Sequence, residues 1–86
     1  MFKKMRGIRL PYDDQGDIFF TCKLYDKKPL DVQQKINNLC TEVGGEHYQA
    51  LRDVVITHKS IREIAIERHV CETVLYTLRR RFYERW

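Results

Sequence analysis

Cysteine is scarce in this chain, which has three among its 86 residues. Cys22, Cys40 and Cys71 lie far apart and form no Cys-x-x-Cys pair. An odd count with this spacing supports neither a disulfide framework nor a zinc ribbon. No two His or Cys residues stand at ligand spacing on one expected element, so we expect no metal and no cofactor. A reducing, cytoplasmic setting fits this cysteine usage best.

Long apolar runs, internal repeats and catalytic motifs are also missing. No window approaches the ~18 consecutive apolar residues of a membrane span, so we expect no membrane partner. No apolar run follows the basic start of the chain, as it would in a signal peptide. Without a repeat or a linker, residues 1–86 are predicted to form a single domain. The absence of a Ser/His/Asp set, a phosphate loop or a nucleotide fingerprint argues against an enzyme.

The chain does carry a mild excess of positive charge. Its 16 Lys and Arg residues against 12 Asp and Glu residues give a formal net charge of +4. Such an excess permits a polyanionic partner without requiring one. The densest basic cluster lies near the C-terminus and consists of Arg79, Arg80 and Arg81.

The N-terminal part of the chain is predicted to contain the only strands. Residues 1–6 are expected to be a frayed, solvated terminus, with a basic arm of Lys3, Lys4 and Arg6 as the alternative. Residues 7–25 are predicted to form a β-hairpin, with its turn over residues 11–16. In its second strand, alternate residues are apolar and share one face: Ile18, Phe20, Cys22 and Leu24. Because a lone two-stranded ribbon is marginal in water, this hairpin must pack on helices or pair with a partner.

Residues 29–57 are predicted to form two supporting helices. In the first, apolar residues recur with helical spacing at Val32, Ile36, Leu39, Cys40 and Val43. Gly44 and Gly45 are expected to end this helix, as a left-handed cap does. The second helix is expected from about Glu46 to Thr57, with a buried stripe of Tyr48, Leu51 and Val55 and with Ala50 and Val54 beside that stripe.

Residues 60–86 are predicted to form two helices joined by a turn. Ser60 with Glu63 three residues later predicts a capping box at the start of a short helix. Residues 69–71 are expected to make the turn. The helix over residues 72–86 has an apolar stripe of Leu75, Leu78, Phe82 and Trp86. A capped short helix, a short turn and a longer cationic helix indicate a helix-turn-helix. The predicted fold class is therefore α+β, with the hairpin packed on a bundle of about four helices.

The stretch from Ser60 to Arg80 resembles the helix-turn-helix of sigma-factor region four and of small regulators carried by phages and mobile elements. Ala65 supplies the small residue that the crossing of the two helices needs. The family usually has glycine where this chain has His69, and often an apolar residue where this chain has Arg68. The resemblance implies a small DNA-binding protein, either a transcriptional regulator or an accessory factor of a phage or mobile element.

The resemblance also implies that helix 72–86 inserts its outward face into the major groove of double-stranded DNA. The residues then expected to contact bases are Thr73, Tyr76, Thr77 and Arg80. The residues expected to contact phosphates are Lys59, Ser60, Arg62, Arg79 and Arg81. The Arg cluster has a plainer explanation as well, because cations near a helix C-terminus are stabilising without any partner.

A protein-interaction module is the alternative function, for example a phage-encoded binder or inhibitor of a host enzyme. Its partner, or a second copy in a homodimer, would contact the hairpin and the C-terminal aromatic residues. Those aromatic residues are equally explained as core residues, with Phe82 and Trp86 locking the last helix onto the hairpin or onto the helix that begins near Pro29.

Overall fold

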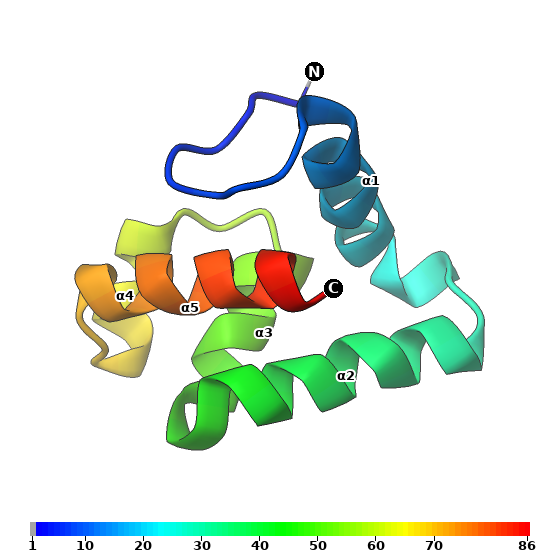
Figure 1. Cartoon of the computed structure of the whole chain (residues 1–86). Coiled ribbons are helices and arrows are strands. Elements are labelled where there is room, and N and C mark those ends of the chain that lie inside the picture. The colour runs from blue at the N-terminus through cyan, green and yellow to red at the C-terminus, as the bar shows by residue number, and fades with distance from the viewer. Residues whose placement is uncertain (1) are drawn as a thin grey trace.

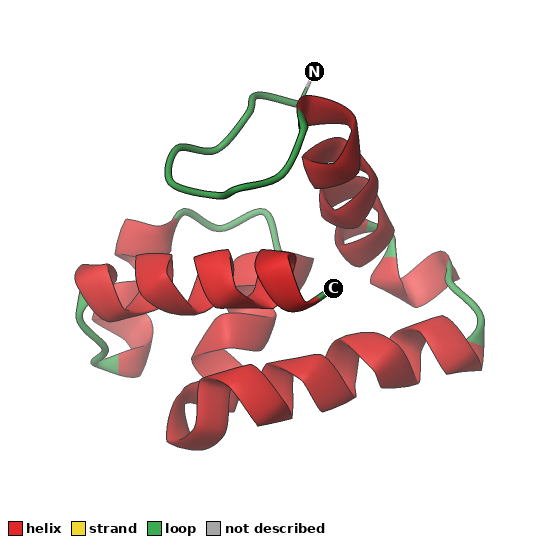
Figure 2. Cartoon of the chain, in the orientation of Figure 1, coloured by secondary structure: helices red, strands yellow, loops and turns green. Residues whose placement is uncertain are grey.

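The computed structural model describes residues 2–86, and this part of the chain contains helices and loops but no strand (Figures 1 and 2). The α-helices are α1 (Tyr12–Lys23), α2 (Leu30–Gly44), α3 (Tyr48–Ile56), α4 (Ile61–Arg68) and α5 (Glu72–Arg85). Two short 3-10 turns, η1 (Tyr25–Lys27) and η2 (Gly45–His47), precede and follow α2. The α+β prediction is therefore wrong, because the fold of the described residues is all-helical.

The hairpin predicted over residues 7–25 is wrong because most of it forms α1. Of the alternating apolar set, Ile18 and Cys22 are buried, whereas Phe20 and Leu24 are 49% and 44% exposed. An alternating pattern also contains pairs four residues apart, and one such pair makes the buried side of a helix. In this segment Ile18 and Cys22, four residues apart, lie on the buried side of α1.

The ends of α1 explain why a helix forms there. Pro11 stands directly before the first turn, where its missing N–H has no helical partner to lose. Asp13 and Asp14 occupy the first turn and Lys23 the last. These charges match the positive and negative ends of the helix dipole.

Residues 2–10 form an N-terminal arm that is pinned to α1. The fully buried Gln15 accepts a hydrogen bond from the Met5 N–H at 2.9 Å through Oε1. Its Nε2 donates to the carbonyl oxygen of Leu10 at 3.0 Å. Phe2 is only 7% exposed, and the Tyr12 hydroxyl donates to its carbonyl at 2.8 Å. The prediction of a frayed terminus is therefore wrong for residues 2–6. Met1, the first residue of that predicted segment, lies outside the described residues.

The core lies where α2, α3 and α5 meet. From α2 the predicted residues Ile36, Leu39 and Cys40 are buried, and Val32 and Val43 are partly buried. From α3 the predicted stripe residues Leu51 and Val55 are buried, as are Ala50 and Val54 beside them. Tyr48 is instead 40% exposed. From α5 the structure buries Leu75, Leu78, Phe82 and, unforeseen, Tyr83.

The helix, turn and helix expected over residues 60–86 are present as α4, residues 69–71 and α5. The Ser60 hydroxyl oxygen accepts a hydrogen bond from the Glu63 N–H at 3.1 Å and so caps α4. His69 is left-handed, with φ 55° and ψ 43°, and the Val70 N–H donates back to the Ala65 carbonyl at 3.1 Å. This is the C-cap geometry that glycine favours, and here histidine adopts it.

Candidate nucleic-acid interface

The outward face of α5 carries the residues expected to contact bases. Thr73 and Arg80 are exposed and Tyr76 is 50% exposed, whereas Thr77 is partly buried. The Thr77 hydroxyl donates to the Thr73 carbonyl at 3.0 Å, so its donor is used within the helix and its methyl group is left for contact. Among residues 2–86, Arg80 makes no ion pair. It is the most available charged group on this face.

The residues expected to contact phosphates differ in how free they are. Arg62 and Arg81 are exposed and form no ion pair within the described chain. Lys59 is held by Glu67, with 2.8 Å between Nζ and Oε2, and that hydrogen bond raises the Lys59 pKa. The Ser60 hydroxyl is engaged as the cap of α4. Lys59 and Ser60 are therefore less available to a ligand than the sequence suggested.

Arg79 is half-buried rather than solvated. Its guanidinium carbon lies 5.2 Å from the centre of the Tyr76 ring, and burial lowers the Arg79 pKa. Residues two apart on a helix point roughly 160° apart, so Arg79 and Arg81 lie on opposite flanks of the face that carries Arg80. Arg79 lines pockets that also contain residues of the arm and of α1, so it lies at the edge of the core rather than on the solvated surface.

The N-terminal arm lies beside the same face of α5 (Figure 1). A pocket of about 230 Å³ separates Arg6 and Gly7 of the arm from Tyr76 and Arg80 of α5. The arm is tied to α5 further along, where the Arg9 N–H donates to the Glu84 carboxylate at 3.2 Å. This position adds Arg6 to the candidate interface, which the sequence indicated only as part of a basic arm, the alternative to a frayed terminus.

A second pocket, called the basic pocket below, lies between the end of α1, the loop before α4, and α5. Its volume is about 220 Å³, and its polar lining consists of Lys23, His58, Lys59, Ser60 and Arg79. Tyr83 forms part of its apolar wall, and no carboxylate lines it. Sequence reasoning missed Lys23 altogether, because it was assigned to a strand.

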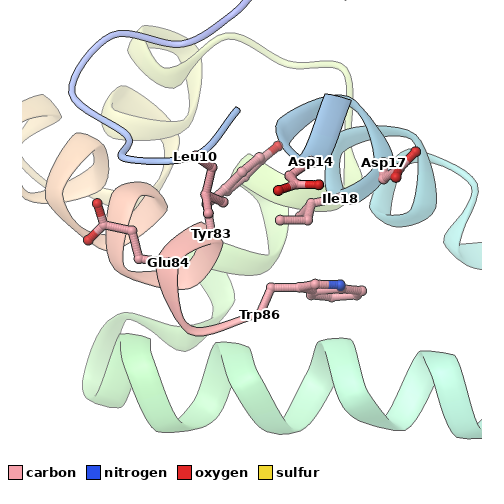
Figure 3. Close-up of a pocket in the computed structure, with 7 residues that line it drawn as sticks. All are labelled: Leu10, Asp14, Asp17, Ile18, Tyr83, Glu84 and Trp86. Atoms are coloured by element: carbon pink, nitrogen blue, oxygen red, sulfur yellow. The ribbon is translucent and has the colours of Figure 1, made fainter. Parts of the chain in front are cut away.

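Tyr83 also lines a third pocket, called the acidic pocket below (Figure 3). It measures about 340 Å³, and its lining includes Asp14 and Asp17 from α1 and Glu84 from α5. Trp86 closes it at the end of α5 and lies over α2, where the Lys35 ammonium is 4.0 Å from the ring centre. This pocket repels a polyanion and marks one limit of the candidate interface.

The C-terminal aromatic residues are core or core-edge residues in this fold. Phe82 is fully buried, Tyr83 is 3% exposed, and Trp86 is partly buried with its ring centre 5.9 Å from that of Phe82. The exposed aromatic residues are instead Tyr12 and Phe20 on α1, Tyr48 on α3 and Tyr76 on α5. A partner surface built from exposed aromatics would therefore not use the C-terminal end of α5, and α1 is the element that carries two of them.

Three further observations concern metal sites, membrane-spanning helices and similar proteins. Within residues 2–86, no three His, Cys, Asp or Glu side chains are grouped as ligands of a metal ion. None of the described helices has the length and apolar character needed to cross a membrane. Comparison of the chain with models of protein families, with curated proteins and with solved structures gives no match.

Proposed function

We propose that this protein binds double-stranded DNA through α5, as a transcriptional regulator or accessory factor of a phage or mobile element. The observation that carries the proposal is the exposed face of α5, on which Arg80 has no ion pair and is flanked by Arg79 and Arg81. The major groove of DNA admits a single α-helix, and Arg bidentate to guanine is the commonest specific contact there.

Each flank of this face has a distinct role in the proposal. Arg80 reads a base edge, and the methyl groups of Thr73 and Thr77 contact thymine. Arg62 and Arg81 are free to contact phosphates, which fix the register without reading sequence. Arg6 of the arm adds a cation beside this face, across the pocket that it shares with Tyr76 and Arg80.

The test is selection of bound duplexes from a random library, followed by affinity measurement of two matched variants. Arg80→Ala is expected to lose about 1–3 kcal/mol of binding and to relax specificity at one base position. Arg85→Ala is the control, because Arg85 lies on the same helix but pairs with Glu42 of α2. If the wild-type protein shows no salt-dependent binding to duplex DNA at low ionic strength, the proposal is wrong.

A protein-interaction module is the second candidate, and the exposed apolar side of α1 favours it. Tyr12, Phe20 and Leu24 are each more than two-fifths exposed, at 46%, 49% and 44%. Exposed apolar groups gathered on one element are typical of interaction surfaces. This candidate predicts self-association, or binding of a host protein, that Phe20→Ser removes and Arg80→Ala leaves unchanged. Sedimentation velocity measures the self-association, and a strictly monomeric wild-type protein would exclude the homodimer.

A further inference from the structure

Arg79, which lines the basic pocket, carries a buried polar group that the protein does not satisfy. Among residues 2–86, Arg79 Nε is the one buried side-chain nitrogen or oxygen without a hydrogen-bond partner. A guanidinium carries five N–H donors and no acceptor, so the donors that Arg79 presents to the pocket can be satisfied only by an acceptor. Buried polar groups are almost always hydrogen-bonded, and each exception needs an explanation.

We propose that the basic pocket binds a phosphate group through Arg79 and Lys23. The two side chains come from α5 and α1, and both line the pocket, in which no carboxylate competes for them. Planar guanidinium donors match the oxygens of a phosphate, and an ammonium adds a compact charge beside them. Phosphate supplies the negative charge and the acceptors that this pocket lacks.

Lys23 is held in place for this role by the end of α3. Its ammonium donates to the Val54 carbonyl at 3.1 Å and to the Thr57 carbonyl, which leaves one of its three donors free. Capping of α3 by a cation explains the position of Lys23 without any ligand. It does not explain why a second, half-buried cation stands in the same pocket with an unpaired Nε.

The position of the pocket indicates where the phosphate comes from. Arg79 lines both the basic pocket and the pocket between the arm and α5, so it stands at the edge of the face that carries Arg80. A phosphate held there would be a backbone phosphate of a duplex whose groove contains α5. This assignment of the source rests on the proposed function, whereas binding of the phosphate group itself does not, and free phosphate is the other source.

The first experiment uses inorganic phosphate and follows the Arg79 Nε–H by NMR. We expect a saturable shift of this resonance in the wild-type protein and, in Arg79→Gln, loss of the saturable shifts of the amides that line the basic pocket. Arg79→Gln is expected to fold, because it removes a half-buried charge that has no partner. Arg81→Gln is the matched control, since it removes an exposed Arg of the same helix and should leave the titration unchanged. Equal, unsaturated shifts at Arg79 and Arg81 would overturn the proposal.

The second experiment uses duplex DNA and distinguishes the two sources. If the phosphate belongs to the duplex, Arg79→Gln lowers the slope of log affinity against log salt by about 0.9, whereas Lys27→Gln, which removes an exposed cation of η1, does not. Duplex binding with an unchanged slope in Arg79→Gln would overturn the duplex source and leave the proposed function standing. Saturable phosphate binding without duplex binding would support the pocket and overturn the proposed function.

Discussion

The basic and acidic pockets share a wall and have opposite charge. Both lie between α1 and α5, and Tyr83 lines both of them. The acidic pocket takes Asp14 and Asp17 from the first half of α1, whereas the basic pocket takes Lys23 from its last turn. The charge order that stabilises α1 through the helix dipole therefore also divides the surface of the molecule.

This division concentrates positive charge locally in a chain whose net charge is only +4. A small excess spread evenly would give weak and undirected attraction, whereas segregated charge orients the approach of a ligand. Arg79 lines the basic pocket and Asp17 the acidic pocket, whereas Arg80 and Glu84, one turn apart on α5, line a common pocket beside the arm. In the proposed function, the flank of α5 that carries Arg79 is therefore the one expected to meet DNA.

The largest expected effect comes from removing the shared wall. Tyr83→Ala should lower the free energy of unfolding by about 3 kcal/mol, because a large buried side chain leaves a cavity between α1 and α5. Tyr76→Ala is the control, since Tyr76 is a half-exposed tyrosine of the same helix. Urea denaturation measures both variants. Equal losses would show that the two pockets are not separated by a packed wall.

Alkaline pH should lower the free energy of unfolding without any mutation. Burial raises the pKa of Cys22 and of Cys40 to about 12, and it raises that of Tyr83 as well. Above pH 9 the unfolded chain releases protons that these folded thiols keep, so stability falls as pH rises, by about 2–3 kcal/mol at pH 10 for the two thiols together. The lowered pKa of Lys23 acts in the opposite direction but involves a single group. Urea midpoints at pH 7 and pH 10 test this, and a flat profile would contradict the burial.

A smaller effect compares two residues one turn apart on α5, Arg80 beside the arm and Glu84 at the acidic pocket. Arg80→Ala should weaken duplex binding about tenfold, the equivalent of ~1.4 kcal/mol. Glu84→Ala should strengthen it about twofold at low salt, because a repelling carboxylate near the acidic pocket is removed. Fluorescence anisotropy with one labelled duplex measures both. If both substitutions weaken binding, the charge division does not orient the duplex.

The smallest expected effect is a difference in reactivity among the three thiols, and it leaves the fold intact. Cys71 is exposed at the start of α5, and hydrogen bonds from the backbone and side chain of Thr73 lower its pKa. Its alkylation rate should therefore rise with pH through a midpoint below the 9.0 of a free thiol. Cys22 and Cys40, which are buried, should not react in the native protein. Mass spectrometry after brief alkylation should find one label, and two labels would contradict the structure around α1 and α2.

The parts of the fold that were predicted correctly depend on neighbours in sequence. The cap at Ser60 and the turn at His69 are local features, because each is made by residues within a few positions of one another. The spacing of apolar residues in α2 likewise places Ile36 and Cys40 in the core. Local hydrogen bonds and helical periodicity can be predicted from a single sequence.

The parts that were missed depend on residues distant in sequence. Alternation in residues 18–24 is compatible with a strand and with a helix, and burial of Gln15 under the arm favours the helix. The basic pocket brings Lys23 next to the elements that carry Ser60 and Arg79, which no spacing rule links. Sequence reasoning placed Arg79 on a solvated flank, because helical periodicity does not show what covers that flank.

A salt titration of duplex affinity tests the role of α5 most directly. For the wild-type protein, we expect the logarithm of affinity to fall linearly with the logarithm of salt concentration, with a slope of about −0.9 for each phosphate contacted. Removing Arg81 should make the slope shallower by about one contact, whereas removing Arg85, which pairs with Glu42, should not change it. Absence of duplex binding at low salt, or equal slopes in all three proteins, would contradict insertion of α5 into the groove.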